Sequence, residues 1–93
     1  MIVGIVYLEM HIPQAGSLKE KRSILNSLKQ KIHGKFNVSV AEVDFFDKWQ
    51  RAAFGIGIVS TEKAHLDSIL ARLESFIAEE LRITVTHWDV RLV

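Results

Sequence analysis

The chain has 93 residues, 48% of them hydrophobic and 25% charged, and its 12 Lys and Arg side chains nearly balance 11 Asp and Glu. This length and composition predict one globular domain over residues 1–93. The absence of cysteine excludes disulfides, zinc–thiolate sites, iron–sulfur clusters and cysteine nucleophiles, and it fits a cytoplasmic protein.

Residues 2–12 have the alternation of a strand. One side carries Val6, Leu8, Met10 and Ile12, and the other carries Tyr7, Glu9 and His11. The run lacks the basic start and the cleavage site of a signal peptide, and Glu9 interrupts it before it could span a bilayer. We therefore expect a buried strand and no membrane association.

The next segment has the pattern of an amphipathic helix. Ser17 and Glu20 have the spacing of a capping box, and Gly34 is a plausible end of the helix. Its apolar stripe consists of Leu18, Leu25, Leu28 and Ile32. The charge is uneven: residues 1–36 carry six Lys or Arg and two Glu, a net charge of +4, whereas residues 37–93 carry a net charge of −3. The basic excess lies almost wholly on this helix.

Two strands follow, over residues 37–45 and 50–60, joined by Phe46–Trp49. The first strand changes phase, which predicts a bulge near residues 41–42. In the second, Gly55 and Gly57 share one face, which indicates close approach by another group.

The remaining residues predict a second helix and a last strand. Ser60 or Thr61 can cap the helix, and the strand covers residues 82–92 with another change of phase. The apolar stripe of the helix contains Leu66, Ile69, Leu70, Leu73, Phe76, Ile77 and Leu81.

The order βαββαβ predicts an α+β ferredoxin-like sandwich, with a four-stranded antiparallel sheet and two helices on one face. The second face would then carry Val3, Ile5, Tyr7, Ala53, Gly55, Gly57 and Val59. Because this set is unusually apolar for a solvated surface, we expect a homodimer, in which a second copy covers the face or an edge strand pairs across a two-fold axis.

Three segments together resemble a known family. They are Ser17-Leu18-Lys19-Glu20-Lys21-Arg22, residues 35–44, and Trp49-Gln50-Arg51-Ala52 with the strand after it. This combination is similar to the YlxP-like proteins, a bacterial family of unassigned function. The resemblance implies a ferredoxin-like fold. The genes of such proteins often lie near those for transcription termination and translation initiation factors, which implies a role around RNA or the ribosome. The family supplies no catalytic residues to carry over.

The basic helix is the first candidate site. Lys19, Lys21, Arg22 and Lys29, together with Arg51, could contact a phosphate backbone. The alternative is a solvated helix face with ordinary surface charges. We interpret Trp49 as an anchor that packs the hairpin against the core.

Other chemistry has weaker support. Glu42, Asp44 and Asp47 could hold a cation, but charges that protect an edge strand, or pairing with Arg51 and Lys48, explain them better. His87 and Asp89 share a strand face and could form a hydrogen-bonded pair. The sequence contains no nucleophile elbow and no phosphate-binding glycine loop, so we predict no catalytic residue, no metal and no cofactor.

These observations leave three functional hypotheses. The first is a non-enzymatic cytoplasmic binding module, dimeric, that acts near RNA or the ribosome through the basic helix. The second is a dimeric protein–protein or small-ligand regulatory domain with a pocket at the dimer interface. The third is an enzyme.

Overall fold

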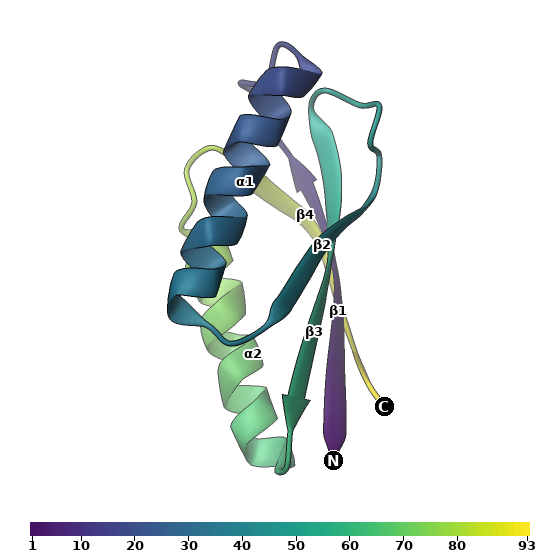
Figure 1. The fold of residues 1–93 in the computed structure, drawn as a ribbon, viewed down its shortest axis with the longest axis vertical. Helices are drawn as coiled ribbons and strands as arrows, with labels where there is room; N and C mark the ends of the chain where they lie inside the picture. The colour runs from purple at the N-terminus through teal and green to yellow at the C-terminus, as the bar shows by residue number, and fades with distance from the viewer.

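The computed structural model describes all 93 residues and confirms the predicted order of elements (Figure 1). The elements are β1 (Ile2–His11), α1 (Leu18–Lys35), β2 (Ser39–Asp44), β3 (Arg51–Ser60), α2 (Lys63–Ala78) and β4 (Thr84–Leu92). The strands form one sheet in the order β2-β3-β1-β4, and every neighbouring pair is antiparallel. This is the ferredoxin-like α+β arrangement expected from the sequence.

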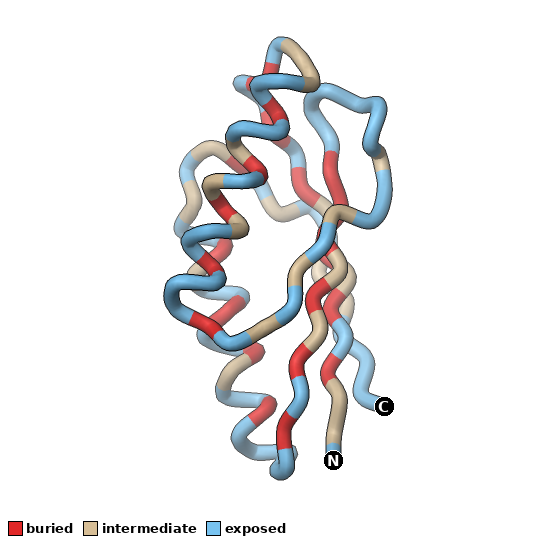
Figure 2. Tube along the Cα trace, in the orientation of Figure 1, coloured by how far each residue is buried: buried red, intermediate tan, exposed pale blue.

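Both helices lie on one face of the sheet, as Figure 1 shows, and the opposite face is bare. The core lies between the two layers, where one side of each strand meets the apolar stripes of the helices (Figure 2). Its members include Val6, Leu8, Met10, Leu25, Leu28, Ile32, Phe54, Ile56, Ile58, Leu66, Leu73 and Ile77. Because successive side chains of a strand point to opposite faces of the sheet, the helices can cover only every second residue of each strand.

Helix α1 begins at the predicted cap, with Ser17 as the N-cap, but the Glu20 carboxylate reaches back to Gly16 and not to the Ser17 amide. The Glu20 amide donates to Ser17 Oγ at 3.1 Å, and Glu20 Oε2 accepts from the Gly16 amide at 3.2 Å. The predicted end at Gly34 is wrong by one residue, because the helix includes Gly34 and Lys35. Phe36 then leaves the helical conformation while its amide still donates to Ile32. Its ring is buried against Phe76 of α2, at 5.5 Å between centroids, which fixes where the chain leaves α1.

Neither residue proposed to cap α2 does so. The N-cap is Glu62, whose side chain makes no capping hydrogen bond. Ser60 instead forms a turn before the helix, because its hydroxyl accepts from the Glu62 amide and donates to the Glu62 carbonyl.

Both expected changes of strand phase are present as irregularities in the ladders. The β2–β3 register shifts between Glu42 and Asp44, slightly later than predicted, and leaves Val43 as the extra residue. The β1–β4 register shifts where His87 pairs with Glu9 and Val85 pairs with Met10. Strand β4 begins at Thr84, two residues later than the predicted boundary.

The β1–β3 register confirms which residues of these strands point to the open face, although Ala53 is fully buried there. It pairs Val3 with Val59, Ile5 with Gly57, Tyr7 with Gly55, and Glu9 with Ala53. These pairs point away from the helices, because their neighbours in the chain, such as Val6 and Ile56, belong to the core. Neither helix combines the length and the apolar character needed to cross a membrane.

Candidate functional site

Lys21 is the most unusual residue of the first helix, because its side chain is buried with only 1% of its surface exposed. Its Nζ donates to the carbonyl oxygens of Phe45 at 2.8 Å, Arg51 at 3.3 Å and Phe46 at 3.4 Å. An ammonium group has three N–H donors, so the loop after β2 and the first residue of β3 accept all of them. Glu42 Oε2 lies 3.3 Å from the same nitrogen and balances its charge without an aligned hydrogen bond.

The loop bound by Lys21 is fixed by further contacts. Phe45 has a left-handed backbone, with φ of 61°, which is uncommon for an aromatic residue. The guanidinium of Arg51 lies 3.8 Å from the centroid of the Phe45 ring. Gln50 Nε2 donates to the carbonyl oxygens of Pro13 and Ala15, which connects this loop to the one before α1. The segment that follows β2 is therefore held against the start of α1.

These contacts correct one of the predicted site residues. Lys21 cannot contact a phosphate backbone in this structure, because its ammonium is enclosed and its donors are satisfied. Its helical position could have revealed this. Lys21 precedes Leu25, Leu28 and Ile32 by four, seven and eleven residues, so it continues their apolar stripe. A residue at such spacings lies on the side of the helix that packs on the sheet.

Three of the other predicted residues share one side of α1. Lys19 and Arg22 are exposed and Lys29 is half-buried. Arg22 and Lys29 are seven residues apart, which is close to two helical turns, so their side chains leave the helix in similar directions. None of the three forms an ion pair. We call Lys19, Arg22 and Lys29 the basic stripe.

The remaining lysines of α1 are on the flank that faces α2. Lys31 Nζ donates to Glu80 Oε1 at 3.1 Å, and Lys35 Nζ lies 5.0 Å from the centroid of the Phe76 ring. These contacts occupy the two lysines, so the basic stripe lies on the side of α1 that is turned away from α2.

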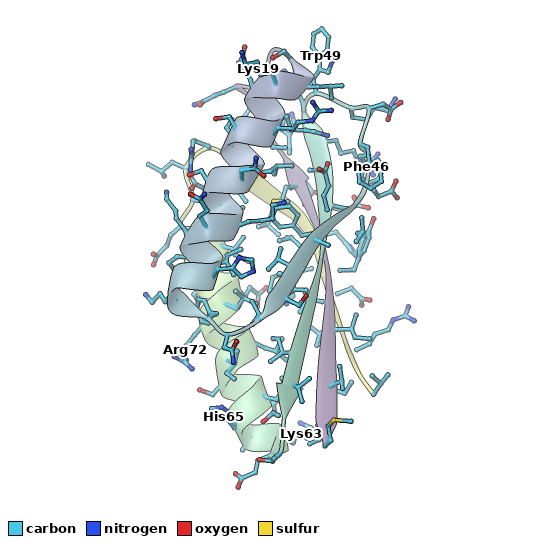
Figure 3. The ribbon with its side chains drawn as sticks, in the orientation of Figure 1. Lys19, Phe46, Trp49, Lys63, His65 and Arg72 are labelled. Atoms are coloured by element: carbon cyan, nitrogen blue, oxygen red, sulfur yellow. The ribbon has the colours of Figure 1, made fainter.

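The tip of the β2–β3 hairpin extends the basic surface at the same end of the molecule. Trp49 is 55% exposed, which makes its predicted role as a core anchor wrong. Figure 3 places Trp49 and Lys19 at this end and Lys63 at the opposite end. A shallow depression of about 580 Å³ is lined by His11, Lys48, Trp49, Gln50 and Arg51. We call Phe46, Lys48 and Trp49 the hairpin tip.

Arg51, the last of the predicted residues, points to the open sheet face. Its Nη2 donates to Glu9 Oε2 at 3.0 Å, and Tyr7 Oη donates to Glu9 Oε1 at 3.0 Å. Hydrogen bonds from Arg51 and, more weakly, from Tyr7 lower the pKa of Glu9. Partial burial and the hydrogen bond to Glu9 raise the pKa of Tyr7. Arg51 is thus already paired, and a phosphate would have to compete with Glu9 for it.

The weaker candidates do not form sites. No three histidine, aspartate or glutamate side chains come together in an arrangement that could hold a metal ion. His87 contacts Tyr7 edge-on, at 6.1 Å between ring centroids, while Asp89 lies 3.5 Å from Arg91 Nε. His87 and Asp89, which the sequence places on one strand face, form no hydrogen bond with each other.

The fold and these surfaces define a ferredoxin-like module with a basic helix stripe beside a fixed, partly aromatic hairpin tip. Comparison with known proteins identifies the family. The model of the family described as "Protein of unknown function (DUF503)" matches residues 3–90, and the chain belongs to this family. It is also 41% identical over 91 residues to the uncharacterized protein YlxP of Bacillus subtilis (strain 168), covering 94% of this chain and 99% of that protein.

Proposed function

We propose that this protein is a non-enzymatic cytoplasmic module that binds single-stranded or looped RNA, such as the exposed loops of ribosomal RNA. The observation that carries the proposal is the fixed juxtaposition of the exposed Trp49 with the unpaired cations of the basic stripe. Lys21 holds these two parts together and does not itself touch RNA.

The hairpin tip supplies a stacking surface. An exposed indole ring can stack on an unpaired base of any identity, and such stacking is worth about 1–3 kcal/mol per base. Phe46, also exposed in the same loop, adds a second aromatic ring (Figure 3). Double-stranded RNA hides the faces of its bases within the stack, so an exposed indole ring can stack only on unpaired nucleotides.

The basic stripe supplies the electrostatic part. Lys19, Arg22 and Lys29 lie along one side of α1, and Lys48 belongs to the tip. Four phosphate contacts on a single strand correspond to a slope of about −3 for log affinity against log salt, at ~0.7 per contact. Arg51 contributes less, because Glu9 already binds its guanidinium.

The direct test is binding of a fluorescently labelled single-stranded RNA, and co-sedimentation with ribosomes, across a salt series. We expect Trp49→Ala to weaken RNA binding about tenfold or more, since the base loses its stacking partner. Arg22→Ala should weaken binding and make the salt slope shallower by ~0.7.

Two variants serve as matched controls. Lys63→Ala removes an exposed lysine at the opposite end of the molecule, paired with Asp67, and should leave the affinity unchanged (Figure 3). Asp47→Asn removes a carboxylate from the loop and should strengthen binding slightly. If Lys63→Ala and Arg22→Ala lost the same affinity for RNA, the binding would depend on the overall charge of the protein and not on the basic stripe. Binding that ignores both salt and Trp49 would contradict the proposal and favour the protein–protein or small-ligand alternative.

A further inference from the structure

The sheet face opposite the helices has an asymmetric relief. On β1 it carries the large side chains of Ile5 and Tyr7, whereas their cross-strand neighbours on β3 are Gly57 and Gly55. A Cβ added to Gly57 would meet no atom within 4 Å, so the space above this glycine is open. Val43 partly fills the space above Gly55, with Cγ1 3.0 Å from the Cβ position. The face thus consists of a ridge on β1 beside a trough on β3.

We propose that a second copy of this chain covers the face, with a two-fold axis parallel to the strands between β1 and β3. Rotation about this axis places the β1 ridge of one copy over the β3 trough of the other. Ile5 of each copy then packs onto Gly57 of its partner, and Tyr7 lies over Gly55 and Val43. The contact is isologous and self-complementary, as a closed dimer requires. The strands of the two sheets run in the same direction, within the usual twist of aligned sheet packing.

The size of the face fits a dimer. Three strands of nine or ten residues and one of six make the sheet. At ~3.3 Å per residue and ~4.8 Å between strands, the sheet covers roughly 600 Å² in projection. The relief of the side chains raises the accessible area towards the ~800 Å² that each partner contributes to a standard interface.

The charges on the face also favour a second copy over a nucleic acid. Glu9 pairs with Arg51 and Asp89 lies beside Arg91, so most charge is balanced within each copy. Asp44 adds a third carboxylate at the β2 edge. Two such faces can meet without strong repulsion, whereas the carboxylates would repel phosphates.

The proposed axis has a consequence for RNA, which rests on the proposed function. An axis parallel to the strands keeps both hairpin tips at the same end of the dimer. One RNA could then contact two tips, which raises the overall affinity through effective concentration.

The first test is the mass of the protein in solution, by sedimentation velocity from about 1 µM to about 200 µM. We expect 21.2 kDa at the upper end, twice the 10.6 kDa of the chain. Ile5 is 44% exposed, and Ile5→Glu should give 10.6 kDa at every concentration. The matched control is Leu81→Glu. Leu81 lies after the end of α2 and not in its apolar stripe as predicted, and it is 94% exposed outside this face, so the variant should stay dimeric. A monomeric wild-type protein, or an Ile5→Glu variant as dimeric as Leu81→Glu, would overturn the proposal. Both readouts are independent of RNA.

The second test fixes the axis. Because the chain has no cysteine, a single engineered cysteine is a unique target for a short bismaleimide cross-linker. His11→Cys, at the end of β1 on the open face, should cross-link to itself in the dimer. His65→Cys, exposed on α2 away from this face, should not (Figure 3). A dimer in which His11→Cys fails to cross-link, or in which His65→Cys cross-links equally well, would overturn this arrangement.

Discussion

Ion pairs hold helix α1 to the rest of the molecule near both of its ends, and the buried member is a cation at the start and an anion near the end. At its start, a buried lysine is surrounded by three carbonyl oxygens, with Glu42 beside it. Near its end, the carboxylate of Glu80, only 8% exposed, accepts from Arg82 and from Lys31. Arg82 also donates to Ser27 Oγ at 3.0 Å, which connects the chain after α2 to the middle of α1.

The difference explains how one helix can carry six basic residues with unlike roles. The first anchor encloses its cation, so Lys21 is part of the fold. The second encloses an anion, and its cations Lys31 and Arg82 stay partly exposed. Of the residues outside both anchors, Lys35 lies over the Phe76 ring, and only the basic stripe keeps its charges free for a partner. A count of positive charges on α1 therefore overstates the surface available for binding.

The largest expected effect breaks the first anchor. Lys21→Met keeps the apolar stem but removes the ammonium, leaving three carbonyls without their donor and Glu42 without its counter-charge. We expect the free energy of unfolding to fall by about 3 kcal/mol or more in urea denaturation. Lys19→Met, an exposed neighbour in the same helix, should change it by less than ~0.5 kcal/mol. Equal stability of the two variants would mean that the anchor contributes nothing.

The second anchor should be visible as a pH dependence. Hydrogen bonds from Arg82, and more weakly from Lys31, lower the pKa of Glu80 to about 2. A carboxylate with a depressed folded pKa stabilises the fold above its unfolded pKa, and this stability is lost as the pH falls from about 4.5 towards 2. The fall in pKa from 4.5 to about 2 corresponds to roughly 3 kcal/mol of stability at pH 7.

Glu80→Gln is the variant that isolates this contribution. The difference in unfolding free energy between wild type and variant should be largest at pH 7 and shrink towards zero near pH 2. A difference that stays constant across this range would assign the effect to packing instead of charge. Because Glu9 titrates in both proteins, its contribution cancels in the comparison.

The smallest expected effect compares the starts of the two helices. Ser17 caps α1 through its side chain, whereas Glu62 at the start of α2 makes no such bond. Ser17→Ala should therefore lower the free energy of unfolding by about 1 kcal/mol, and Glu62→Ala by a few tenths at most. Thermal or urea unfolding of the two variants checks this. A Glu62→Ala loss as large as that of Ser17→Ala would contradict the assignment of the caps.

Most of the architecture could be predicted from the sequence. Alternation in the strands and the stripe on each helix are local patterns with fixed periods, so they revealed the order of elements and the face that stays bare. The extra residue Val43 and the irregularity between β1 and β4 are both visible in the sequence as changes of phase in the apolar alternation of a strand. The cap of α2 could not be predicted, because Ser60 and Thr61 are equally able to cap a helix or to form a turn, and only the position of the helix decides between the two roles.

The candidate site was harder to predict. The position of Lys21 in the apolar stripe was readable from its spacing, but its acceptors are backbone carbonyls of a loop that begins 24 residues later. No local pattern encodes the left-handed Phe45 that turns those carbonyls towards the helix. The exposure of Trp49 depends on the same loop, so the sequence alone favoured a packing role for it.

The most direct test of this account is the order of the hairpin tip in solution, measured by backbone ¹⁵N relaxation. With Lys21 in place, we expect order parameters near ~0.85 for Lys48 and Trp49, similar to the strands on either side. In Lys21→Met they should fall below ~0.6 while those of Lys19→Met stay unchanged. A tip that remains as ordered in Lys21→Met as in the wild-type protein would contradict the claim that this buried lysine fixes the binding surface.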